Sequence, residues 1–210
     1  MVPDEIIINL LTLFLILYFI TQLTMDVYTK RGAETSEIIT NHGISETDTD
    51  VFTPGISSLI MFILWISIIV TRKLSLGLDN LKYFIIEQPD YLHFILQLTG
   101  MTFVFLGVLL ANWSRILRGV NSPNWGFKER SILITNGPYR YIRHPSYTFY
   151  ILVCSGIAIL TQIWFVYLLI FGVSRYTNVV KVEEKMLRLQ FGAEYEDYQA
   201  HTKKFLPFIW

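Results

Sequence analysis

The chain has 210 residues, of which 52% are apolar and 16% are charged, with equal numbers of acidic and basic side chains. An ordinary soluble domain carries about 25% charged residues, so the composition argues against a soluble protein. The net charge of zero indicates no nucleic-acid partner. The single cysteine, Cys154, excludes an internal disulfide and a cysteine-rich metal site, and it is interpreted as a small buried apolar residue.

The charges are segregated along the chain, and four long segments carry none. A membrane-spanning helix needs about 20 mostly apolar residues. The first three uncharged segments therefore each predict one transmembrane helix. The first segment lacks the basic start and small-residue cleavage site of a signal peptide, which favours a permanent helix. The four uncharged segments are Ile6–Met25, Val51–Thr71, Tyr91–Ser114 and Pro145–Ser174.

The connections between these spans differ in character. The acidic segment Asp26–Asp50 is expected to be a flexible loop. In Arg72–Asp90, apolar residues recur near helical spacing between charged ones, which predicts an amphipathic helix at the membrane interface.

The fourth uncharged segment is too long for one span and too short for two. Only Arg175 interrupts its continuation to Val180. This pattern favours two helices, Ser146–Leu160 and Ile163–Val180, joined by a turn at Thr161–Gln162. The alternative is one long tilted helix, which would give four spans in all.

Five spans divide the basic residues unevenly between the two sides of a membrane. One side would hold fourteen of the seventeen lysines and arginines, and the other only Arg72, Lys73 and Lys82. The positive-inside rule then predicts an outside amino terminus and a cytoplasmic carboxyl terminus.

The segment Arg115–His144 and the residues from Lys181 onward would both be cytoplasmic. The first contains the turn-rich "NSPNWGF" and then "SILITNGPY", a strand-like piece ending in a turn. The tail predicts a helix from Lys181 that Gly192 ends, and a second helix in "AEYEDYQAHTKKF". The predicted fold is thus an all-α integral membrane protein with about five transmembrane helices, of which the last two form a hairpin, and a cytoplasmic helical tail. Its two regions are 1–114, with three membrane helices, and 115–210, which carries the chemistry.

Polar chemistry is concentrated in "GPYRYIRHPSY", directly before the fourth apolar segment. Pro145 suits the first turn of a helix and forces His144 into an extended conformation. The first backbone N–H groups of that helix, together with the guanidinium of Arg143, are expected to bind a carboxylate or a phosphate. Arg140 and Tyr141 have an equally good interpretation as interfacial anchors, as does Arg118.

The tail offers the opposite charge in Glu183 and Glu184. Tyr176 lies seven residues before Glu183 and shares its helical face. These carboxylates are suited to hold the hydroxyls of a ribose or a cation, and tyrosine rings attract a sulfonium or ammonium. The alternative is a surface pair between Glu184 and Arg188, four residues apart.

The paired motifs "GPYRYIRHPSY" and, about forty residues later, "EEKMLRLQFGAEYEDYQAHTKKFLPFIW" resemble the isoprenylcysteine carboxyl methyltransferase family. The related phospholipid N-methyltransferases share this architecture. The resemblance runs from about Asn124 to Trp210. It implies an integral membrane methyltransferase that uses S-adenosylmethionine, with the cofactor at the cytoplasmic ends of the last helices, enclosed by the tail.

The resemblance also implies residues of the site. Gly192, Glu194 and Tyr198 match the family motif but are given no role in the site. Arg143 and Glu184 are the expected catalytic residues. Trp125, Arg175 and Tyr195 are the expected substrate-binding residues, and no metal is expected. One departure is Val179, where many relatives carry an arginine. The residues expected to bind the cofactor are Gly137, Tyr139, Arg143, His144, Pro145, Tyr147, Tyr176, Glu183 and Glu184.

The favoured function is carboxyl methylation of an isoprenylcysteine-like or other lipidic substrate that enters from the bilayer. A carboxylate needs no base, whereas methylation of a lipid amine would need one such as Glu184 or His144. N-methylation of a phospholipid is the main alternative. Membrane reductases of the sterol type share an Arg-His-Pro-x-Tyr element but usually have Asn where this chain has Ser146, and they lack the glutamate pair. A non-catalytic membrane scaffold is the last alternative, and the oligomeric state is open.

Overall fold

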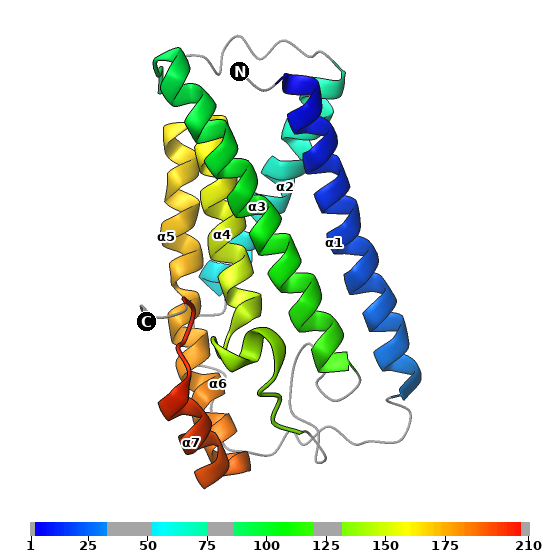
Figure 1. Cartoon of the computed structure of the whole chain (residues 1–210), viewed down its shortest axis with the longest axis vertical. Helices are drawn as coiled ribbons and strands as arrows, with labels where there is room; N and C mark the ends of the chain where they lie inside the picture. Colours follow the sequence, from blue (N-terminus) through cyan, green and yellow to red (C-terminus); the bar gives the residue numbers. More distant parts are fainter. Residues whose placement is uncertain (1–2, 33–51, 75–85, 120–131, 207–210) are drawn as a thin grey trace. The chain divides into compact units, whose positions relative to one another are not determined.

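The computed structural model describes residues 3–32, 52–74, 86–119 and 132–206, and helices dominate this part of the chain (Figure 1). Three of them are long and apolar enough to cross a membrane: α1 (Asp4–Gly32), α2 (Phe52–Lys73) and α3 (Asp90–Arg118). The predicted all-α class and the first three spans are therefore confirmed at the level of helices. The count of five spans and the orientation stay predictions.

The fourth apolar segment folds into helices of opposite direction, as predicted. Helix α4 covers Pro145–Thr161, and the chain reverses at Gln162, which has a φ of 55°. The part of the chain after this reversal differs from the single helix predicted over Ile163–Val180. It consists of η5 (Trp164–Tyr167), α5 (Leu168–Ser174) and α6 (Tyr176–Phe191).

Several predicted boundaries were wrong because a helix does not end where its apolar run ends. Its hydrogen bonds are internal, so polar residues at helical spacing prolong it. Helix α1 therefore includes Asp26, and α3 includes Arg115 and Arg118. Helix α6 continues past Val180 to Phe191, in agreement with the helix predicted from Lys181 to Gly192.

The extended piece predicted in "SILITNGPY" forms no strand in its described part, residues 132–139. Its end is the 3-10 helix η4 (Gly137–Arg140). The centre of the predicted interfacial helix, residues 75–85, and the turn-rich "NSPNWGF" lie outside the described residues.

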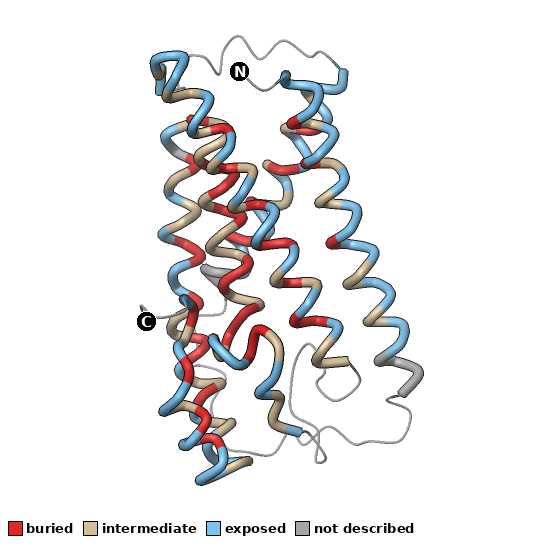
Figure 2. Tube along the Cα trace, viewed as in Figure 1, coloured by how far each residue is buried: buried red, intermediate tan, exposed pale blue. Residues whose placement is uncertain are grey.

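The chain divides into two compact units, and α1, α3, α4 and α6 each contribute to both. The first unit comprises residues 1–17, 51–108 and 149–177. Its buried core includes Met61 and Trp65 of α2 and Val153 of α4. Figure 2 colours the buried positions along the chain red. A Cβ on Gly156 of α4 would lie 2.8 Å from the carbonyl oxygen of Gly100 in α3. Small residues of this kind let membrane helices approach closely.

The second unit comprises residues 18–50, 109–148 and 178–210. It holds the last turns of α3, η4, the start of α4, most of α6 and the helix α7 (Ala193–His201). Gly192 separates α6 from α7 with a φ of 54°, so the predicted helix end is confirmed. The residues after α7 then run beside the segment that precedes α4. Arg143 N–H donates to the carbonyl of Lys203 at 2.8 Å, and His144 N–H donates to that of Lys204 at 3.1 Å.

Candidate active site

Four residues of the second unit form a charged cluster, of which Arg143, His144 and Glu184 are largely buried and Glu183 is partly exposed. Arg143 Nε donates to Glu184 Oε1 at 2.9 Å, and the two side chains are only 9% and 7% exposed. Arg143 Nη1 donates in addition to the carbonyls of Gln199 at 3.2 Å and Thr202. The guanidinium therefore joins α6 to the end of α7 and the tail.

His144 lies between the two carboxylates. Its Nδ1 is 3.5 Å from Glu183 Oε2, and its Nε2 is 3.4 Å from Glu184 Oε1, although the second contact lacks hydrogen-bond geometry. Tyr147 Oη donates to Glu183 Oε1 at 2.5 Å, and Lys204 Nζ is 3.4 Å from Glu184 Oε2. Glu183, with a side chain 35% exposed, is the more open of the two carboxylates.

The cluster changes the protonation of its own members. Burial alone would raise the pKa of Glu184, but the close contact with His144, the hydrogen bond from Arg143 and the positive charges of both side chains lower this pKa to about 2. Burial would lower the pKa of His144, but its contacts with Glu183 and Glu184 outweigh burial and raise it. The cluster therefore favours an ionised Glu184 beside a protonated His144.

Tyrosines surround the cluster. Tyr139 is buried, and its carbonyl accepts a hydrogen bond from Tyr198 Oη at 2.7 Å. Tyr195 is fully buried, and its Oη makes no hydrogen bond with the described residues. Burial is the main cause that raises the pKa of all three phenols, so they remain neutral.

The structure corrects the predicted anion site at the start of α4. Pro145 does begin the helix, as expected. However, the N–H groups of Arg143 and His144 donate to the tail, and those of Tyr147 and Thr148 donate to the carbonyl of His144. The guanidinium of Arg143 holds Glu184, so the carboxylate that it binds belongs to the chain itself. The motif shows neither the position of the tail nor the local hydrogen bonds to the carbonyl of His144.

The other predicted site residues are not all located at the charged cluster. Gly137 has a φ of 58° and packs so closely on α3 that a Cβ would lie 2.3 Å from Leu117 Cδ1. Tyr176 belongs to the other unit, where its Oη lies 2.9 Å from Ser58 Oγ. Arg175 is exposed at the end of α5 in that unit, and Trp125 lies outside the described residues.

Sequence reasoning missed Gln199 and Thr202, whose carbonyls hold Arg143. No side-chain pattern marks a backbone carbonyl as a ligand, so the motif carried no signal for them. It also gave no role to Lys204, which contacts Glu184. Arg140 and Tyr141, left open between anchor and site, are both exposed, with the guanidinium 6.0 Å from the tyrosine ring centroid.

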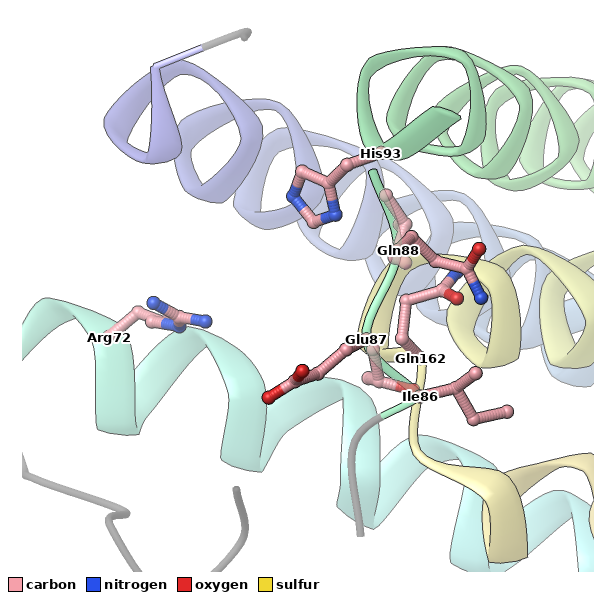
Figure 3. A pocket seen from close by; sticks show the side chains of 8 residues that line it. Arg72, Ile86, Glu87, Gln88, His93 and Gln162 are labelled. Atoms are coloured by element: carbon pink, nitrogen blue, oxygen red, sulfur yellow. The ribbon is translucent and has the colours of Figure 1, made fainter. Parts of the chain in front are cut away.

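The first unit contains a separate cavity of about 320 Å³ where α2 and α4 end and α3 begins (Figure 3). None of the predicted site residues lines it. Its cation, Arg72, is paired with Asp4 at 3.0 Å. In the part of the chain that the structure describes, no three His, Cys, Asp or Glu side chains are grouped to hold a metal ion. The cavity is lined by Arg72, Ile86, Glu87, Gln88, His93, Leu160, Thr161 and Gln162.

Comparison with known proteins identifies relatives that match a large part of this chain. Residues 95–194 match the family model described as phospholipid methyltransferase. A protein-S-isoprenylcysteine O-methyltransferase of Tribolium castaneum is 29% identical over 115 residues, which cover 52% of this chain and 41% of that protein. A probable protein-S-isoprenylcysteine O-methyltransferase of Oryza sativa subsp. indica is 26% identical over 131 residues, 59% of this chain and 66% of the relative.

The same name is carried by a protein of Schizosaccharomyces pombe that is 26% identical over 126 residues, 57% of this chain and 53% of the relative. The matches thus span from two fifths to two thirds of the relatives' length. The chain is thus similar to the phospholipid methyltransferases over residues 95–194 and to proteins named as isoprenylcysteine O-methyltransferases. The resemblance to the isoprenylcysteine carboxyl methyltransferase family is confirmed.

Proposed function

We propose that this chain is a membrane-embedded methyltransferase that uses S-adenosylmethionine to methylate the carboxyl group of an isoprenylcysteine-like or other lipidic substrate. The observation that carries the proposal is the charged cluster. The two motifs that resemble the family lie about forty residues apart in the sequence, and in the structure their charged members contact one another. The names of the relatives support the reaction type.

The residues around the cluster fit the chemistry of this cofactor. Glu183 is an accessible carboxylate that would accept hydrogen bonds from an ammonium or from ribose hydroxyls. Tyr195 Oη and His144 Nε2 are buried and make no hydrogen bond with the described residues. The ring of Tyr147 would favour a nearby sulfonium. When bound, S-adenosylmethionine would supply the activated methyl group.

The protonation of the cluster supports a carboxylate acceptor over an amine. An amine must lose a proton before it attacks, and an efficient base has a pKa near the working pH. The pKa of Glu184, about 2, makes it a weak base, and the raised pKa of His144 favours its protonated form, which cannot accept a proton. A carboxylate is ionised already, so the protein needs only to position it and exclude water.

In this proposal Arg143 acts through its partners rather than on the substrate. Its guanidinium fixes Glu184 and the tail, and so it positions the wall of the cofactor site. The proposal includes the predicted topology of five spans with the cluster at the cytoplasmic face. The lipid portion of the substrate would then enter between helices from the bilayer.

A second candidate is N-methylation of a phospholipid headgroup. It is favoured by the match of residues 95–194 to the phospholipid methyltransferase model. The substrate would again be a lipid that reaches the site from the membrane.

Transfer of label from methyl-labelled S-adenosylmethionine tests both candidates. The purified protein in lipid nanodiscs is incubated with N-acetyl-S-farnesylcysteine or with phosphatidylethanolamine. We expect label on the farnesylcysteine that mild base releases as methanol, because a methyl ester hydrolyses. Base-stable label on the phospholipid would select the second candidate. Absence of transfer to either acceptor by protein that remains folded would contradict both.

A further inference from the structure

Two arginines in the last turns of α3, Arg115 and Arg118, are not used by the charged cluster. Arg115 is 1% exposed, although α3 is one of the candidate membrane spans. An arginine that merely anchors a helix extends its charge into water or among headgroups. Burial of a charge is costly unless partners compensate it, and charges within spans mark functional sites. Arg115 therefore needs another explanation than anchoring.

The hydrogen bonds of these two arginines are incomplete. Arg115 Nη2 donates to Asp26 Oδ1 at 2.7 Å, whereas its Nε and Nη1 are buried and make no hydrogen bond with the described residues. Arg118 Nη2 donates to Ser146 Oγ at 3.1 Å, and its buried Nε has no partner among these residues. Arg118 also forms no ion pair with a carboxylate in the described part of the chain. Such N–H groups suit a bidentate anion.

The pair belongs to the same unit as the charged cluster. Ser146, the partner of Arg118, stands between His144 and Tyr147 in the sequence. The positive charges of Arg118 and Arg115 act on the phenol of Tyr139, which the family resemblance assigns to the cofactor site. The close packing of Gly137 on α3 fixes this arrangement.

We infer that Arg115 and Arg118 bind the anionic group of the methyl acceptor. This inference rests on the proposed function and names the residues that recognise its substrate. The anion is the carboxylate of an isoprenylcysteine-like acceptor or the phosphate of a phospholipid, which share the chemistry that a guanidinium recognises. The place of the pair on an apolar helix suits a lipidic ligand.

Equilibrium binding in nanodiscs tests the inference without relying on turnover. N-acetyl-S-farnesylcysteine is compared with its primary amide, and phosphatidylethanolamine with diacylglycerol. The variants are Arg118→Gln and Arg115→Met, and Arg140→Gln is the matched control because Arg140 is exposed in the same unit. We expect the wild type and the control to prefer one anionic ligand over its uncharged analogue. Each variant should weaken binding of that ligand about 10- to 100-fold and leave the analogue unchanged.

The two pairs of ligands distinguish the source of the anion. Preference for the acid over the amide identifies a carboxylate, and preference for the phospholipid over diacylglycerol identifies a phosphate. The inference is overturned if the wild type shows neither preference, or if both variants retain it.

A parallel titration with S-adenosylmethionine separates this inference from the proposed function. If the wild type does not bind the cofactor, the proposed function fails. If the variants lose affinity for the cofactor and not for the acceptor, the arginines bind the cofactor's own carboxylate and the inference is wrong.

Discussion

The second unit holds two groups of buried charged side chains, the charged cluster and the two arginines at the end of α3, and their hydrogen bonds are satisfied to different degrees. In the charged cluster, Arg143 and Glu184 pair with each other and with tail groups. At the end of α3, Arg115 and Arg118 keep buried N–H groups that no described residue satisfies. Removing one partner of a fully satisfied buried ion pair is costly, whereas a buried arginine with only some of its N–H groups satisfied costs little to replace by an apolar side chain of similar size. The difference suggests that the cluster supports structure and that the α3 arginines serve a ligand.

The largest expected effect is that of Arg143→Met. Its removal leaves Glu184 buried without its main partner, so we expect a loss of about 3–5 kcal/mol in the free energy of unfolding. Arg115→Met, of matched size, should cost little or should stabilise the protein, because its partner Asp26 has a side chain 40% exposed. Chemical unfolding of both variants in detergent micelles measures the contrast. Equal losses in the free energy of unfolding for the two variants would contradict the distinction between the charged cluster and the α3 arginines.

The titration of Glu184 and His144 should make the stability of the protein depend on pH, and variants that remove these groups should reduce that dependence. Glu184 has its pKa lowered to about 2, so its contribution is complete above the ordinary value near 4.5 and decreases as pH falls toward 2. His144 has a raised pKa, so its contribution is complete below about 6.5 and is lost as pH rises through the higher folded value. Melting temperatures from pH 4 to 9 should therefore fall on the alkaline side, and His144→Gln should flatten that fall. An unchanged alkaline slope in His144→Gln would contradict the assignment.

A glycine pair tests how firmly η4 is fixed against α3. Gly137→Ala adds a Cβ beside Leu117 and forces a left-handed conformation on alanine. Gly192→Ala has the same sign of φ but meets no atom within 4 Å. We expect backbone strain to cost about 1–3 kcal/mol at Gly192, and a larger loss at Gly137, where the contact with Leu117 adds to the strain, in unfolding experiments. A smaller loss at Gly137 than at Gly192 would show that η4 is not held by α3.

The smallest expected effects distinguish two tyrosines of α7. Tyr198→Phe removes a hydrogen bond to the carbonyl of Tyr139 and should cost about 1 kcal/mol. Tyr195→Phe removes a hydroxyl without a described partner, so the free energy of unfolding should stay unchanged or rise. If Tyr195 contacts substrate, its variant should still lower methyl transfer. Equal destabilisation by both variants would show that Tyr195 has a structural partner.

Composition and motifs predicted the helical class, three candidate spans, the reversal at Gln162 and the end of α6 before Gly192. These features depend on local properties such as apolar length and glycine geometry. The two family motifs also predicted that Arg143, His144, Glu183 and Glu184 belong together, and the distances confirm it.

The misplaced features depend on contacts between distant segments. The anion site at the start of α4 was assigned without two sets of contacts. The backbone of the tail accepts the N–H groups of Arg143 and His144, and the carbonyl of His144 accepts those of Tyr147 and Thr148. Arg115 and Arg118 were assigned to the cytoplasmic segment after the third span, with Arg118 as a possible interfacial anchor, because the apolar run ends before them, whereas α3 continues to Arg118. Their burial depends on packing that no sequence period reveals.

Titration calorimetry with S-adenosylmethionine tests the central claim most directly. The wild type should bind the cofactor, and Glu183→Gln should bind it more weakly by about tenfold or more, since it loses a charged hydrogen-bond acceptor. Arg188→Gln, which alters an exposed arginine of the same helix, should bind as the wild type does. Folded wild-type protein that gives no heat of binding with this cofactor would contradict the account.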